Sequence, residues 1–161
     1  MPVRPEMRSA AILRALYLLA AAAVGLFAGA MLTEAGVLVP YWRSLGAAEF
    51  YAWYAANDER LFSFFGSLTV AALVLALLAA IVSLRQRAQS RRLWAASAAL
   101  MLACVLMFPL YFEAANASFS AATLSDGELS KELARWASWH SVRTFLSSVA
   151  FVLALRACCL R

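Results

Sequence analysis

The chemistry that this sequence could carry centres on its one histidine, His140, which lies in an apolar segment near the C-terminus. Arg143 follows three residues later, so the two side chains share one face of a helix. An imidazole can remove a proton as a general base, and a guanidinium can stabilise an anion that develops on a substrate. An arginine at mid-bilayer costs about 2.5–3.5 kcal/mol, and such residues normally face the bundle interior and find a partner there. We therefore expect His140 and Arg143 to face a polar site inside a bundle.

Partners for this pair occur at the ends of other apolar segments. Glu34 ends the first such segment, Glu113 ends the third, and Asn116 follows Glu113 by about one helical turn. The topology set out below brings these ends to the same side of the membrane as His140, so the side chains should converge there. We expect three catalytic residues, His140, Arg143 and Asn116. We expect a substrate pocket formed by Glu34, Glu113, Trp136 and Trp139.

Three interpretations of this polar group remain open from the residues alone. In the first it is structural: Arg143 pairs with Glu113 or Glu34, while His140 and Asn116 form hydrogen bonds across helices. In the second, Glu34, Glu113 and His140 bind a metal, although Arg143 would repel the ion and a second histidine is missing. In the third no metal is present, His140 is a general base, and Arg143 stabilises a developing anion.

The composition requires that these residues sit in a membrane protein. Of 161 residues 65% are hydrophobic and only 14% are charged, and the mean hydropathy is +0.76. A soluble domain this small could not hide so much apolar surface. The net charge of +5 does not indicate nucleic-acid binding, because zinc-finger spacing, aromatic-basic interleaving and a basic recognition helix are all missing from the sequence. The expected environment is therefore a lipid bilayer.

We expect one integral membrane domain over residues 1–161 that folds as an all-α bundle of four transmembrane helices. The expected spans are residues 10–39, 61–84, 93–112 and 136–155, since about 20 apolar residues cross the hydrocarbon core. Residues 41–58 are rich in Tyr and Trp and should form a short amphipathic helix on the outer surface, as an aromatic belt or a lid. Pro109 predicts a kink, and the GxxxG spacing of Gly25 and Gly29 suits internal packing or a homo-oligomer.

The distribution of charge predicts the orientation in a cell membrane. Nine of the 14 Lys and Arg residues lie near the two termini or in the hairpin RQRAQSRR, and eight of the nine acidic residues lie at the other side. Cytoplasmic loops carry the excess of Lys and Arg. We therefore expect both termini and this hairpin to be cytoplasmic, and the polar group to lie near the outer face.

The stretch around His140 resembles a known family. Its pattern W-x-x-W-H-x-V-R-T comprises Trp136, Trp139, His140, Val142, Arg143 and Thr144. It is similar to the most recognisable stretch of the anthrone-oxygenase-like family of small membrane proteins. Asn116 resembles the family's Asn at the end of the third helix, although Ala114 and Ala115 replace the Pro-Leu that usually precedes it. A glycine-rich first helix followed by Pro40 also matches the family.

The resemblance implies a four-helix membrane bundle and an activity, because a few fungal members oxidise anthrones to anthraquinones. An anthrone has an acidic ring C–H, so a base can form a carbanion that reacts with oxygen directly and without a cofactor. His140 would then remove the proton, and Arg143 with Asn116 would hold the enolate oxygen. Fold membership alone does not establish function, because one fold can serve several.

The leading hypothesis is therefore a small cofactor-free oxidoreductase that acts on a hydrophobic aromatic or quinone-like compound entering from the lipid. The alternative is a non-catalytic membrane scaffold or partner subunit whose buried polar residues only fix helix packing. A carrier or channel is disfavoured, because the spans carry few further charges and show no inverted repeat.

Overall fold

The structure, a computed structural model, describes residues 5–160, which are helical apart from short turns. Its helices are α1 (Pro5–Thr33), α2 (Val39–Ser44), α3 (Ala47–Arg85), α4 (Arg91–Met107), α5 (Glu113–Ser120) and α6 (Asp126–Cys159). Two π-helical turns, η1 (Glu34–Leu38) and η2 (Phe108–Phe112), join α1 to α2 and α4 to α5. No β-strand occurs between residues 5 and 160. The expected all-α fold is confirmed.

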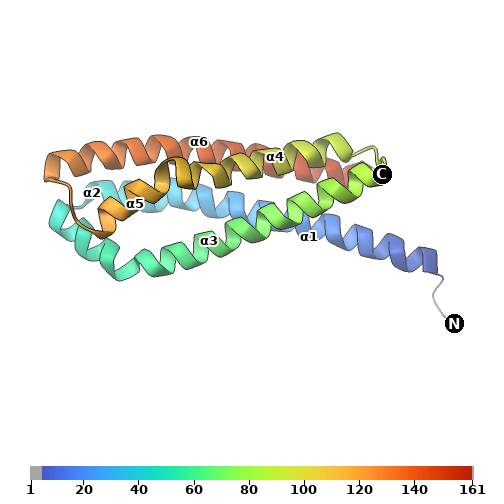
Figure 1. The fold of residues 1–161 in the computed structure, drawn as a ribbon, viewed down its shortest axis with the longest axis horizontal. Coiled ribbons are helices and arrows are strands. Elements are labelled where there is room, and N and C mark those ends of the chain that lie inside the picture. Colours follow the sequence, from blue (N-terminus) through green and yellow to red (C-terminus); the bar gives the residue numbers. More distant parts are fainter. Residues whose placement is uncertain (1–4, 161) are drawn as a thin grey trace.

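Within the described residues, four helical segments are long and apolar enough to cross a membrane: Ser9–Ser44, Ala47–Arg85, Arg91–Ser120 and Asp126–Cys159. Helices α1 and α4 each pack against both α3 and α6, so the four form a closed ring of neighbours (Figure 1). The start of α1, the α3–α4 turn and the end of α6 lie at one end of the bundle, and α2 and α5 lie at the other. The expected four-helix membrane bundle is confirmed, and the cytoplasmic placement of its termini stays a prediction.

Small side chains fill the places where the helices approach one another, and large apolar side chains point outward. The buried face in the second half of α3 consists of Ala72, Ala76, Ala79, Ala80 and Ser83. Most of the exposed large side chains are leucine, valine, isoleucine and phenylalanine. Helices in membranes associate through small residues that let backbones come close, because lipid tails already solvate the large apolar side chains. This distribution fits a bundle surrounded by lipid.

Both π-helical turns lie beside a proline. Pro109 is inside η2, and Pro40 follows η1 as the second residue of α2. Proline lacks the backbone N–H and its ring clashes with the carbonyl four residues earlier, so regular α-helix cannot continue undisturbed. A π-helical turn holds one extra residue and therefore rotates the helix that follows by about 100° relative to a regular helix. The departure from α-helical geometry expected at Pro109 is present, and it sets the direction of the α5 side chains.

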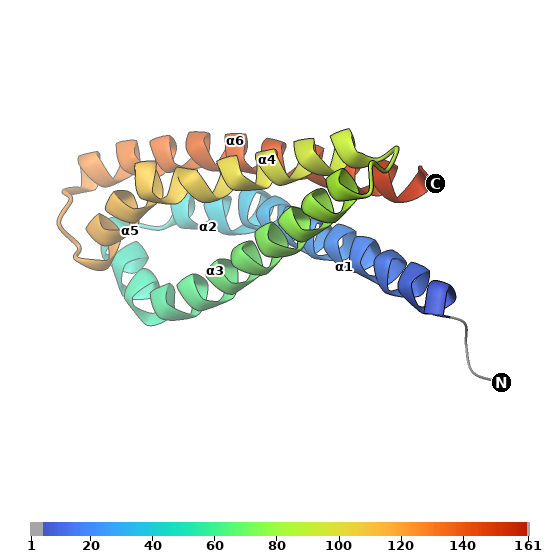
Figure 2. The same ribbon diagram turned by 45° about the vertical axis from the view of Figure 1, so that its right-hand side comes forward.

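Residues 41–58, expected as a short amphipathic helix at the outer surface, do not form one helix of their own. Residues 41–44 complete α2, and residues 47–58 form the beginning of α3. Gly46 is the N-cap of α3, and its backbone N–H donates to Glu49 Oε2 at 3.2 Å, which favours a helix start at Ala47. Pro and Gly are absent from α3 before Gly66, so nothing ends the helix after residue 58. The first part of α3 nevertheless runs in a different direction from the rest (Figure 2).

The two glycines of the GxxxG pattern have different surroundings, which gives a test of the bundle. A Cβ atom on Gly25 would lie 2.6 Å from the Phe151 ring of α6, whereas a Cβ atom on Gly29 would meet nothing within 4 Å. We expect Gly25→Ala to be less stable than the matched Gly29→Ala by about 1–3 kcal/mol, because the ring must turn away from α1. Thermal unfolding in detergent micelles measures this difference, and equal melting temperatures would contradict the packing of α1 on α6.

Candidate active site

Three polar side chains from two helices meet in the half of the bundle that contains α2 and α5. Glu34 comes from the start of η1, and His140 and Arg143 come from α6. Arg143 Nη2 donates to Glu34 Oε2 at 3.2 Å and to His140 Nδ1 at 2.9 Å. The side chains of Glu34 and His140 are almost fully buried, and that of Arg143 is 14% exposed. Of the two expected partners for Arg143, Glu113 and Glu34, the ion pair is therefore formed with Glu34.

The hydrogen bonds of His140 determine where its ring carries a proton. A guanidinium has only donors, so Nδ1 must accept from Arg143 with its lone pair. The Met31 carbonyl oxygen, 3.0 Å from Nε2, can only accept, so Nε2 must carry the hydrogen. Thr144 supports this arrangement, because its hydroxyl lies 3.3 Å from Nε2 and donates to the His140 carbonyl at 2.8 Å. His140 is thus neutral, and its lone pair is already used to hold Arg143.

Aromatic rings surround the guanidinium and the imidazole. The Arg143 Cζ atom lies 4.2 Å from the centroid of the Phe112 ring, a cation–π distance. Trp136 stacks on His140 with ring centroids 5.0 Å apart. The indole N–H of Trp136 donates to Asn116 Oδ1 at 3.0 Å, which orients the amide of Asn116. Arg143 is thereby kept in one place by charge, hydrogen bonds and ring contacts together.

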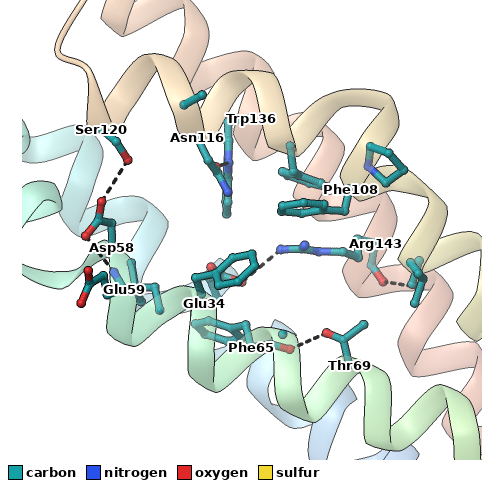
Figure 3. A pocket seen from close by; sticks show the side chains of 18 of the residues that line it. Glu34, Asp58, Glu59, Phe65, Thr69, Phe108, Asn116, Ser120, Trp136 and Arg143 are labelled. Carbon is teal, nitrogen blue, oxygen red and sulfur yellow. Dashed lines mark hydrogen bonds and ion pairs between the residues drawn. The ribbon is translucent and has the colours of Figure 1, made fainter.

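A cavity of about 550 Å³ lies beside this ion pair, between α3 on one side and α4, η2 and α5 on the other. Figure 3 shows Arg143 and Glu34 reaching toward one another at the cavity, with Asn116 and Trp136 side by side above them. Most of the lining is apolar or aromatic. Its polar or charged residues are Glu34, Asp58, Glu59, Thr69, Asn116, Ser120 and Arg143. Such a cavity suits a hydrophobic molecule that carries a few oxygen atoms.

Four of the seven residues expected from the sequence line the cavity. The residues that line the cavity are Glu34, Asn116, Trp136 and Arg143. His140 lies behind the ion pair and faces a second, smaller hollow between η1, α2 and α6. Glu113 is exposed, and Trp139 is 37% exposed and stacks on Tyr111 instead. The extra residue of η2 rotates α5 about its axis. The Glu113 side chain is therefore exposed and does not point into the cavity.

The metal site considered for Glu34, Glu113 and His140 is not assembled. Glu113 is exposed, away from the other two side chains. Arg143 Nη2 lies within 3.2 Å of Glu34 and within 2.9 Å of His140, where an ion would need to bind. From residue 5 to residue 160, no three His, Cys, Asp or Glu side chains gather in a way that could hold a metal ion. This hypothesis is wrong for that set of residues.

Sequence reasoning missed most of the aromatic walls. Trp42 and Tyr54, both from the segment that was expected on the membrane surface, are buried and line the cavity. Phe65 and Phe108 line it from opposite sides. Apolar side chains carry no local signal that separates a cavity wall from a lipid-facing stripe. Thr144 could have been found, because it lies one turn after His140 in the same motif.

Comparison with known proteins identifies the family of this chain. The family model described as Anthrone oxygenase matches residues 50–153, about two thirds of the chain. The matched range contains Asn116, Trp136, His140 and Arg143, whereas Glu34 and Trp42 precede it. Searches of curated proteins and of solved structures found no match. Because this match covers more than half of a chain that folds as a four-helix membrane bundle, the chain belongs to the anthrone oxygenase family.

Proposed function

We propose that this protein is a cofactor-free oxidoreductase of the anthrone-oxygenase type that acts on a hydrophobic aromatic or quinone-like compound. The observation that carries the proposal is Arg143, which lines an aromatic cavity between membrane-spanning helices and is held there by Glu34 and His140. Both of its hydrogen bonds use Nη2, so its Nη1 has no protein partner among the described residues. The side chain is 14% exposed and lines the cavity, so a ligand oxygen there is a suitable acceptor.

The proposed reaction balances with oxygen as the only co-substrate. One anthrone and one O₂ yield one anthraquinone and one water: the ring CH₂ loses both hydrogens to water and gains one oxygen atom as a carbonyl. Removal of the first proton forms an enolate, and its oxygen would accept hydrogen bonds from Arg143. Asn116 would add a second donor, because its Oδ1 already accepts from Trp136 and its NH₂ group remains available. Donors that are already in place stabilise such an anion without reorganisation.

The geometry favours Glu34 over His140 as the base. Glu34 lines the cavity, and its contacts with Arg143 and His140 both use Oε2, which leaves Oε1 without a protein partner among the described residues. The lone pair of His140 is occupied by Arg143, and the ring does not line the cavity. In this proposal Glu34 removes the proton, Arg143 and Asn116 hold the enolate oxygen, and His140 positions Arg143.

The alternative function is a non-catalytic membrane scaffold or partner subunit. The observation that favours it is that Glu34 and Arg143 join η1 to α6, so the same contacts could serve packing alone. Removing one partner of a buried pair costs about 3–5 kcal/mol, so stability measurements alone cannot separate the two functions. Oxygen consumption by membranes that contain the protein, with added anthrone, separates them. A non-catalytic subunit would add nothing to the rate of control membranes.

The first prediction from the proposed function concerns Glu34. We expect Glu34→Gln to lower the rate of anthrone oxidation about 10²-fold or more, the usual contribution of a general base. The matched control is Glu113→Gln, which changes an exposed carboxylate at the same end of the bundle and should retain full activity. The assay follows oxygen uptake and anthraquinone absorbance in reconstituted vesicles. Full activity of a folded Glu34→Gln protein would rule out Glu34 as the base.

The second prediction separates a positioning role of His140 from a role as base. Glutamine can accept from Arg143 and donate to the Met31 carbonyl, whereas leucine can do neither. We expect His140→Gln to keep kcat within about tenfold of the native value, and His140→Leu to lose about another tenfold or more, since each misplaced catalytic group costs orders of magnitude. If both folded variants were equally inactive, His140 would be the base and Glu34 would not.

A further inference from the structure

Two phenylalanine rings lie next to each other on the side of the cavity that faces the membrane. Phe62 of α3 and Phe108 of η2 both line the cavity, and their ring centroids are 6.1 Å apart across the space between the two helices. Phe62 is 66% exposed, and Val70, two turns further along the same wall, is 59% exposed. Both phenylalanines lie in the segments predicted to cross the membrane, so their exposed surfaces contact acyl chains. A single layer of side chains therefore separates the cavity from lipid.

The end of the cavity nearest α5 is chemically different. Ser120 of α5 donates to Asp58 Oδ2 of α3 at 3.1 Å, and the two side chains face each other across this end (Figure 3). Glu59 lies beside Asp58 in the lining. A neutral aromatic compound entering here would have to break this hydrogen bond and pass two carboxylates. A polar, charged rim of this kind gives no attraction to a lipid-soluble molecule.

The lateral side also has the looser construction. Gly66 follows Phe62 by one turn in the cavity wall, and a Cβ atom there would meet nothing within 4 Å. Phe108 is the first residue of the π-helical turn η2. The residue after it, Pro109, has no backbone N–H and cannot donate a hydrogen bond. Movement of the two rings therefore requires the loss of few hydrogen bonds and no ion pair.

We propose that a neutral, planar aromatic compound dissolved in the bilayer enters the cavity by parting Phe62 and Phe108, with its oxygen directed toward Arg143. This inference rests on the proposed function, which supplies the chemical class of the ligand. Phe62 and Phe108 are thereby determinants of access, since they admit lipid-soluble compounds from the side. The Asp58–Ser120 end stays closed while the ligand enters.

Two crosslinks test the route. The full-length protein with Cys104→Ala, Cys158→Ser and Cys159→Ser serves as the reference in phosphatidylcholine vesicles that contain 1,8-dihydroxyanthraquinone. In one variant, cysteines replace Phe62 and Phe108. In the other, cysteines replace Asp58 and Ser120. A short thiol crosslinker joins the two cysteines of each variant. Quenching of tryptophan fluorescence reports binding, because Trp42 and Trp136 line the cavity.

We expect the lateral crosslink to slow association about tenfold or more, while the crosslink at the α5 end leaves the rate close to the reference. Phe62→Ala should speed association without any crosslink. Its matched control is Phe64→Ala, which removes an exposed ring of the same helix that does not line the cavity and should change nothing.

The opposite pattern, in which only the α5-end crosslink slows binding, would overturn lateral entry and leave the proposed oxidation untouched. Equal rates for Phe62→Ala and Phe64→Ala would also overturn it. If the compound bound by the lateral route but membranes did not oxidise anthrone, the entry route would stand and the proposed oxidation would fail. If the reference protein did not quench at all, the ligand class would be wrong and both proposals would fall.

Discussion

The rest of this structure depends on one requirement: the guanidinium of Arg143 must find its hydrogen bonds inside an apolar bundle. Lipid offers no partner, so an intramembrane arginine has to be satisfied by the protein. Glu34 neutralises its charge, His140 accepts a hydrogen bond from it, and Phe112 covers its face. Packing between the helices must hold each of these residues at the right height and facing the guanidinium. The cost of burying one cation therefore specifies how η1, η2 and α6 meet.

The irregular turns of the helices lie where this requirement is met. Glu34 is the first residue of η1, and Phe112 is the last residue of η2. π-Helical turns are uncommon and frequently occur at functional sites, because the extra residue redirects side chains that a regular helix would point elsewhere. In this bundle they direct a carboxylate and an aromatic ring toward the same guanidinium. Proline beside each turn makes the regular alternative less favourable, since it removes a helical hydrogen bond.

The cavity and the ion pair have complementary chemistry. The ion pair and the amide of Asn116 supply polar groups at one place, while the walls supply aromatic surface. A molecule that is largely apolar with an oxygen at one edge matches both parts. Membership in the anthrone oxygenase family fits this class of compound, and Phe27, Glu34 and Trp42 line the cavity although they precede the matched range.

Two features could be predicted from the sequence alone, because they depend on local composition: the membrane environment and the four long helices. The length of an apolar segment and the charges at its ends can be read from the sequence without knowing which helices pack together. The directions of the side chains depended on the tertiary structure. The rotation of each helix about its axis is set by packing between segments that are distant in the sequence. The π-helical turns change this rotation, and the hydrophobic periodicity of a regular α-helix does not reveal that change. For that reason the sequence did not reveal that Glu113 and Trp139 lie outside the cavity lining or that Trp42 and Tyr54 form part of its walls. The occupied lone pair of His140 likewise became visible only in the folded chain.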